Sequence, residues 1–171
     1  MKKVLTLIAV VLMAVTSVKA QWEVGGVIGG MYGASAKYWF NDKVALQADL
    51  AVGLTRAAGD GWNAGFYDFT INPNALYHFD LPQNFKVYTG GGLSFGLVND
   101  LKGNSNTVNG KFGLNAVGGV SYDLQQVPLT FAFDFRPGYG LGFWGENKNF
   151  RPAGSVSYFD WKLALAIRYR F

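Results

Sequence analysis

The sequence predicts an all-β protein, an eight-stranded antiparallel up-and-down transmembrane β-barrel that follows a cleaved N-terminal signal peptide. Three observations lead to this prediction. Eight segments alternate apolar and polar residues with a period of two, and the apolar faces of these segments carry no charged residue. The connections between the segments mostly alternate between short and long. The alternation of apolar and polar residues is typical of strands with different surroundings on their two faces, and a barrel that crosses a membrane is built from such strands.

The first twenty residues have the parts of a secretory signal peptide. Lys2 and Lys3 give a charged start, an apolar run from Val4 to Val15 follows, and small residues precede position 21. A membrane helix is the alternative, but it needs about 20 apolar residues, and this run is shorter. We therefore expect residues 1–20 to be the signal peptide and residues 21–171 to form one barrel domain.

The net charge of the chain depends on this leader. The chain has 15 basic and 11 acidic residues, and three of the basic residues, Lys2, Lys3 and Lys19, lie in the leader, which leaves 12 against 11. Nucleic-acid binding requires clustered Lys and Arg. Because the basic and acidic residues nearly balance without the leader, we predict no nucleic-acid partner. The chain has no cysteine, which excludes disulfides and thiol ligands.

The first four predicted strands cover residues 22–29, 34–40, 44–55 and 63–79. Glycines weaken the alternation in the first strand, and the second sets its apolar side chains opposite Lys37. The third strand has apolar residues at every second position over its whole length, which fits a strand better than a helix. The fourth contains Pro73, where we expect a bulge or a local break, because proline lacks a ladder donor.

The last four predicted strands cover residues 85–97, 111–122, 129–139 and about 158–171. The seventh strand places three phenylalanines on the face opposite Asp134 and Arg136. The eighth alternates most strictly, and its apolar face carries an aromatic residue at each end, Trp161 and Phe171. Aromatic residues at both ends of an apolar strand face are typical of a strand that crosses a membrane.

The predicted connections differ in length. They are short around residues 31, 41, 82 and 125, and longer and richer in Gly and Asn around residues 59, 104 and 149. The longest is predicted to run from residue 140 to about 157. Short periplasmic turns and longer extracellular loops are usual in outer-membrane barrels. Because the number of predicted strands is even, we expect both chain ends on the periplasmic side.

The charged residues of the strands all fall on the faces opposite the apolar ones. A charge on a lipid-facing position near the bilayer midplane costs about 2 to 4 kcal/mol for Arg or Lys, so the apolar faces are predicted to point outward. The interior of an eight-stranded barrel is just wide enough for side chains to fill it. We therefore predict a plugged lumen with a network of paired charges, formed by Glu23, Lys37, Asp49, Asp68, Lys86, Asp134, Arg136, Lys162, Arg168 and Arg170.

Two stretches resemble a known family. They are Lys37-Tyr38-Trp39-Phe40-Asn41-Asp42-Lys43, with the alternating strand that follows, and the closing Tyr169-Arg170-Phe171. The chain resembles the small outer-membrane β-barrel proteins called porin-like or OmpA/OmpX-like. The resemblance implies export to the bacterial outer membrane of a Gram-negative cell and contact with outer-membrane lipid. It also implies insertion by the barrel assembly machinery, with Tyr169 and Phe171 as the assembly signal.

The function that we predict first is non-enzymatic, a structural or surface-interaction role through the extracellular loops with an unknown extracellular partner. The possible surface-binding residues are Phe143, Trp144, Lys148, Phe150 and Arg151. No catalytic residue, cofactor or metal is predicted. Asp49, Asp68 and Asp134 are interpreted as partners of lumen cations, because buried charges are normally paired.

Two alternatives remain open. The first is a lipid-modifying outer-membrane enzyme on the same barrel, for which His78, the only histidine, would need a nearby nucleophile and carboxylate. The predicted place of His78, facing inward beside a short turn, argues against this role. The second alternative is a soluble ligand-binding barrel, which would need an apolar interior instead of a charged one.

Overall fold

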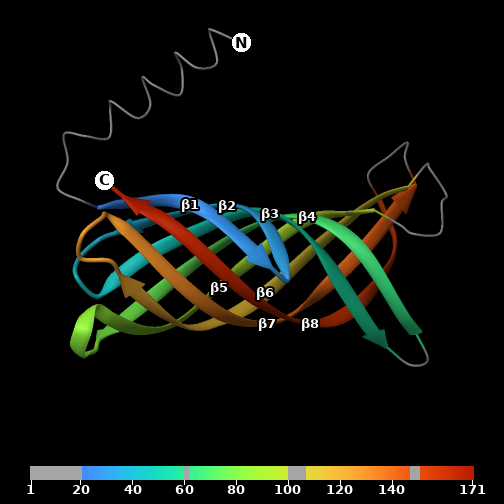
Figure 1. Ribbon diagram of the computed structural model, residues 1–171. Helices are drawn as coiled ribbons and strands as arrows, with labels where there is room; N and C mark the ends of the chain where they lie inside the picture. The colour runs from blue at the N-terminus through green and yellow to red at the C-terminus, as the bar shows by residue number, and fades with distance from the viewer. Residues whose placement is uncertain (1–20, 60–61, 100–106, 147–150) are drawn as a thin grey trace, which may run out of the picture.

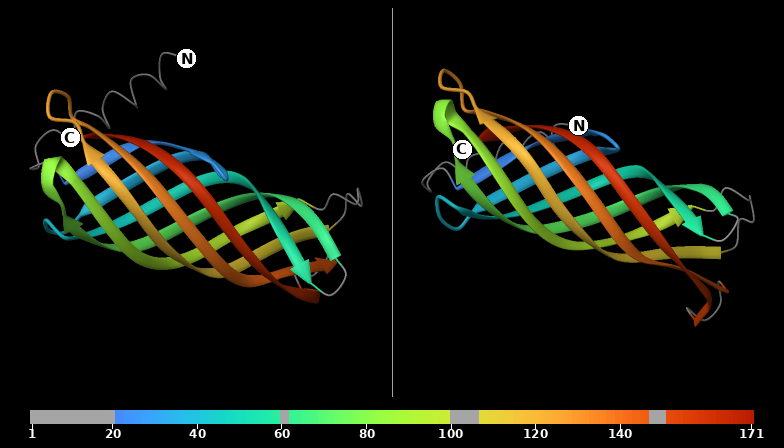
Figure 2. Two further views of the ribbon diagram at one scale, coloured as in Figure 1. Left: turned by 60° about the horizontal axis from the view of Figure 1, so that its bottom comes forward. Right: turned by 90° about the horizontal axis from the view of Figure 1, so that it is seen from below.

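The structure is a computed structural model that describes residues 21–59, 62–99, 107–146 and 151–171. The predicted signal peptide lies outside these ranges. Eight antiparallel strands form one closed barrel in sequence order, as Figures 1 and 2 show. The strands are β1 (Trp22–Gly29), β2 (Met31–Trp39), β3 (Val44–Gly59), β4 (Trp62–Asp80), β5 (Phe85–Asn99), β6 (Thr107–Asp123), β7 (Leu129–Glu146) and β8 (Arg151–Arg170). The predicted all-β up-and-down barrel is confirmed.

The barrel closes where the last strand pairs with the first. β8 pairs with β1 from Arg170 opposite Glu23 to Ala164 opposite Gly29. The two chain ends of the barrel lie at one end, which we call the terminal end. The strand ends at which β3 leads to β4, β5 to β6 and β7 to β8 lie at the other, the loop end (Figure 1). Within the described residues, no helix has both the length and the apolar character needed to cross a membrane.

Several strands are longer than predicted. The predicted loops around residue 59 and from 140 to 157 are largely strand, since β3 reaches Gly59, β7 reaches Glu146 and β8 begins at Arg151. The described ends of the predicted loop around residue 104 are also strand, since β5 reaches Asn99 and β6 begins at Thr107. The prediction failed because hydrogen bonds between backbones hold these hairpins beyond the apolar part of the wall. Glycines at every second position of β7, such as Gly140 and Gly142, weaken the apolar–polar pattern there, although Leu141 and Phe143 continue the outward face of Tyr139.

The first hairpin is the exception at the loop end. β1 and β2 have 8 and 9 residues, while β3 has 16 and β8 has 20. Their connection is made by Gly29, which has φ +118°, and Gly30, whose amide donates to the Leu163 carbonyl at 2.7 Å. Glycine adopts positive φ without the steric cost of a Cβ. The hairpin therefore stops short of its neighbours, as Figure 1 shows.

Pro73 interrupts one ladder and leaves the register unchanged. β4 pairs with β3 at Ala48–Pro73 and passes this position as one continuous strand. Its pairing with β5 stops after Ile71 and resumes at Asn74 in the same register. The expected local break is present in this ladder, whereas the alternative that we gave, a bulge, is not, because a missing donor removes a bond without inserting a residue.

The two faces of the wall have opposite character. On β8 the outward side chains of Leu163, Leu165 and Ile167 are 43%, 51% and 48% exposed. Arg168, the next residue toward the terminal end, is 0% exposed. Large apolar side chains cover the outside of all eight strands, and most of the buried polar and charged side chains point inward. This is the reverse of a soluble ligand-binding barrel and suits a lipid environment.

Aromatic side chains on the outer face gather at the terminal end. Tyr38 lies 4.9 Å from Trp22 and 5.1 Å from Phe40 between ring centroids. Tyr169 and Phe171 pack edge to face at 5.0 Å. Aromatic residues in such a belt are typical of a membrane–water interface.

Candidate functional site: the charged interior

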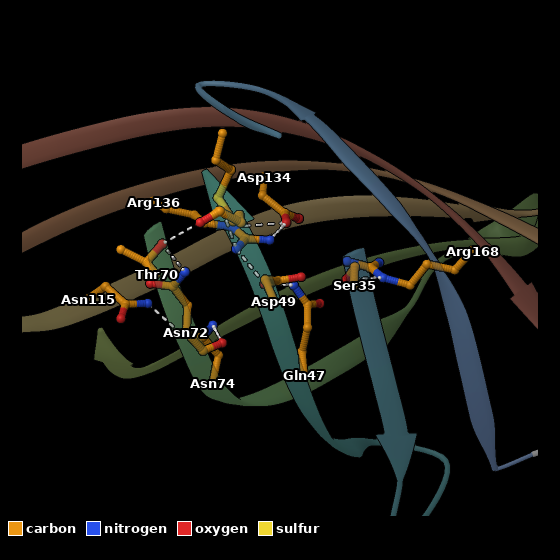
Figure 3. A network of polar contacts seen from close by, with 12 residues as sticks. Ser35, Gln47, Asp49, Thr70, Asn72, Asn74, Asn115, Asp134, Arg136 and Arg168 are labelled. Atoms are coloured by element: carbon orange, nitrogen blue, oxygen red, sulfur yellow. Dashed lines mark hydrogen bonds and ion pairs between the residues drawn. The ribbon is translucent and has the colours of Figure 1, made fainter. Parts of the chain in front are cut away.

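The centre of the interior is held by Arg136 of β7. Its Nη1 donates to Asp49 Oδ2 at 2.6 Å, and its Nε donates to Asp134 at 3.1 Å, with a second bond from Nη2 to the same carboxylate. All three side chains are buried. Gln47 supports Asp49 from the same strand through a 2.9 Å bond, and Tyr88 of β5 donates its hydroxyl proton to Asp134. Figure 3 shows Arg136 beside both carboxylates.

A second charged group lies toward the loop end. Asp68 of β4 is paired with Lys111 of β6 and with Lys162 of β8, the latter at 3.5 Å. Lys162 also contacts Asp160 at 3.1 Å. Lys111 and Asp160 are not among the residues predicted for the lumen network. The alternation of Lys111 with Phe112 was the signal that could have placed Lys111 there.

A third group closes the terminal half of the interior. Lys37 Nζ lies 3.3 Å from His78 Nε2, and the His78 ring lies 4.3 Å from the Trp39 ring and 4.9 Å from the Tyr88 ring between centroids. Lys37 and His78 are 1% and 0% exposed. Glu23 accepts a 2.8 Å hydrogen bond from the Trp39 indole. The side-chain contacts of His78 in the described part of the chain are to a cation and two aromatic rings, so the catalytic arrangement of a hydrolase is not found around it.

The rim of the terminal end holds a fourth group, which was predicted with the wrong partners. Lys86 and Arg170 each lie 3.2 Å from Asp123, which also accepts a 2.7 Å bond from Thr130. We expected these cations to pair with Asp49, Asp68 and Asp134. The expectation is wrong because Asp123, read as part of a turn, ends β6 at the level where β5 begins and β8 ends.

Arg168 differs from the other cations. Its Nε donates to Ser35 Oγ at 2.8 Å (Figure 3). Among the described residues no carboxylate lies within ion-pair distance, so the predicted direct pairing is wrong. Asp49, Asp134 and Glu23 attract its charge from farther away. Because Gly25 lies opposite Arg168 on β1, the two backbones approach so closely that any side chain at this position would meet the Ile167 carbonyl.

The predicted surface-binding residues are not in one loop. Phe143 and Trp144 belong to β7 and Arg151 begins β8, while Lys148 and Phe150 lie outside the described residues. Phe143 is 41% exposed and packs over Gly110, where a Cβ would collide with its ring. The described part of this stretch is therefore the end of a β-hairpin.

The two residues predicted as an assembly signal also complete the wall. The Phe171 amide donates to the Trp22 carbonyl at 3.0 Å, which ties the last residue to the first strand. Tyr169 lies opposite Val24 of β1 and Leu129 of β7. These contacts show the role of this end of β8 in closing the wall, while its role in assembly stays a prediction.

The interior contains a cavity of about 40 Å³ between the central group and the loop end. It lies next to Met31, Arg136 and Lys162, which belong to three different strands. A cavity needs about 10–15 Å³ to hold one water molecule, so the space here corresponds to about three waters.

Comparisons with known proteins indicate the fold. No protein-family model matches the sequence, and no curated protein matches it either. Similar solved structures include the N-terminal β-barrel domain of Pseudomonas aeruginosa OprF, with a TM-score of 0.54 and 18% identity over 90% of this chain and 100% of that one. They also include Neisserial surface protein A, with a TM-score of 0.51 and 21% identity over 88% and 93% of the two chains. A third is a major outer membrane protein from Thermus thermophilus, with a TM-score of 0.50 and 16% identity over 90% and 100%. At these identities the likeness concerns architecture alone. The chain has the fold of the eight-stranded outer-membrane β-barrels.

Proposed function

We propose that this chain is an integral outer-membrane barrel without enzymatic activity, whose interior is closed to ions and whose loop end serves structural or surface interactions. The observation that carries the proposal is the combination of an apolar exterior with an interior crossed by paired charges. A lipid bilayer favours the first, and the second supports a closed lumen, because the interior of an eight-stranded barrel is just wide enough for side chains to fill it.

The closure is supported by side chains that reach across the lumen at successive levels. Arg136 extends from β7 to Asp49 on β3, and Lys111 extends from β6 to Asp68 on β4. Closer to the terminal end, the rings of Tyr88 and His78 pack against each other beside Lys37. An ion that passed would have to break pairs that are buried in a low-dielectric environment, which is costly.

The orientation follows from the two ends. We place the terminal end in the periplasm, because it holds both chain ends of the barrel and short turns such as the one that joins β2 to β3. The loop end then faces the medium, where an unknown extracellular partner would bind. Outer-membrane lipid surrounds the wall, and the barrel assembly machinery recognises Tyr169 and Phe171 during insertion.

Planar-bilayer recording tests the closed interior. The purified chain should give no large, stable conductance. The double variant Trp39→Ala, Tyr88→Ala removes two rings from the terminal half of the lumen. It should still give no large, stable conductance, because the Arg136–Asp49 and Lys111–Asp68 pairs cross the lumen at other levels. A large stable conductance from the unaltered chain would overturn the proposal.

Surface labelling tests the location and orientation. An epitope inserted at residues 60–61 should be labelled on intact cells, whereas one inserted at residues 42–43 should be labelled only after the outer membrane is permeabilised. Recovery of the chain in a detergent-free periplasmic extract would contradict the membrane location. Labelling of the second epitope on intact cells would reverse the orientation.

A further inference from the structure

The cavity toward the loop end has an unusual wall. Lys111, Arg136 and Lys162 line it, together with one of their partners, Asp160, which lies 3.1 Å from Lys162. Among the described residues the other three carboxylates that pair with these cations, Asp68, Asp49 and Asp134, are not part of the lining. Asp160 is the acidic residue that the lining contains. The charged group as a whole is therefore nearly balanced, while the surface that faces the cavity is cationic.

Part of the remaining wall consists of neutral hydrogen-bonding side chains, and Met31, Leu114, Gly138 and Tyr139 complete it. Asn72 and Asn115 supply amides, and Ser94 and Tyr158 supply hydroxyls. The Tyr158 hydroxyl lies against two glycines, Gly113 and Gly140, where any Cβ would collide with it. These glycines leave room for the tyrosine ring to lie inside the barrel.

We propose that this cavity binds a single phosphate-class oxyanion. Lysine ammonium and arginine guanidinium groups bind phosphate by charge-assisted hydrogen bonds. The volume of about 40 Å³ matches a small tetrahedral anion, which displaces about three waters. Lys162 is the first contact, and Lys111 and Arg136 hold the inner side.

The exposure of the side chains indicates how the anion arrives. Asp68 and Lys111 are 0% and 2% exposed, while Lys162 and Asp160 are 12% and 13% exposed. The accessible side of the site is therefore at β8, beside the tip of the short β1–β2 hairpin, where a Cβ on Gly53 would lie 3.5 Å from Lys162 Nζ and 3.3 Å from the Gly30 carbonyl.

This level also carries exposed aromatic residues on the outer face. Tyr32 and Trp161 are 59% and 60% exposed on either side of the hairpin tip. Tyrosine and tryptophan are enriched where a membrane meets water. The phosphate can therefore come from two sources, free phosphate in the medium or the headgroup of an outer-leaflet lipid.

The first experiment measures free phosphate. The folded barrel in octyl glucoside, a detergent without phosphate, is titrated with inorganic phosphate and followed by calorimetry and by the amide resonances of Gly30 and Gly53. Saturable binding is expected, weakened at least about tenfold in Lys162→Gln and unchanged in Lys86→Gln, a matched loss of one lysine at the other end of the barrel. Both variants must show heat-modifiable migration, which reports a folded barrel.

The second experiment separates the sources in membranes. Magnetic dipolar coupling between the Lys162 side-chain nitrogen and ³¹P is measured in vesicles of phosphatidylglycerol and of digalactosyldiacylglycerol, without and with inorganic phosphate. Coupling in phosphatidylglycerol alone identifies the headgroup as the source, and coupling in the galactolipid only after phosphate is added identifies the free anion. The proposal is overturned when the unaltered chain shows neither coupling nor saturable phosphate binding, whatever its conductance.

Discussion

Replacing Arg136 by Met should destabilise the barrel strongly, because it leaves two buried carboxylates without their cation. The Arg136 side chain is 4% exposed, and those of Asp49 and Asp134 are 0% exposed, so solvent screens these pairs little. Removal of one partner of a buried pair costs about 3 to 5 kcal/mol. Methionine keeps most of the side-chain volume, so little of the loss should come from an empty space.

The assay is reversible urea unfolding of the barrel in lipid vesicles, followed by tryptophan fluorescence. Lys86→Met is the matched control, because the Lys86–Asp123 pair is 24% and 13% exposed, and partly exposed pairs contribute about 0 to 1 kcal/mol. A second variant, Arg136→Met with Asp49→Asn and Asp134→Asn, should recover much of the loss, since it removes the unpaired charges. A loss below about 1 kcal/mol in Arg136→Met would refute the reasoning that the three groups form one buried unit.

Three further changes test the wall and its assembly. Leu165→Arg, at an outward position that is 51% exposed, should cost about 2 to 4 kcal/mol in the same unfolding assay, whereas Ser155→Arg, outward near the loop end, should cost much less; equal effects would contradict a lipid-facing band. Gly33→Ala should destabilise by about 1 to 3 kcal/mol, because its Cβ would meet the Leu50 carbonyl of β3, while Gly118→Ala should be nearly neutral, since its Cβ would meet nothing within 4 Å. Phe171→Ala should lower the amount of heat-modifiable barrel in the outer membrane severalfold while refolding in detergent continues, and a normal cellular amount would show that the terminal aromatic is not an assembly signal.

The sequence was sufficient to predict the wall, because each residue of a strand has one of two orientations. The alternation in β8 separates Leu163, Leu165 and Ile167 from Arg168, and burial follows this division. The pair Arg136 and Asp134 was also within reach, since residues two apart on a strand share a face. Alternation does not predict the height along the barrel axis at which a side chain meets the opposite wall. That height depends on the stagger of the strands around the barrel.

This missing quantity explains the errors in the predicted pairs. Lys86 was placed with the acids of the lumen, yet the stagger of β5 and β6 brings it to Asp123 at the rim. Arg168 faces the lumen as predicted, but its level is that of Ser35 and Gly25, so its contact is a hydroxyl. The ends of the long strands were missed for a different reason. Beyond the apolar band, pairing rests on backbone groups that are the same for every residue except proline.

The small interior residues of β8 and its neighbours make the charged groups possible. Ala164 and Ala166 are buried at inward positions of β8, and Ala51 and Ala132 are buried inward on β3 and β7. An eight-stranded barrel has little interior space, so a long side chain such as Arg136 can cross it only where the facing positions are small. The buried alanines of the last strand belong to an apolar cluster with Val27 and Leu76, and they leave volume in the lumen that longer side chains at these positions would fill.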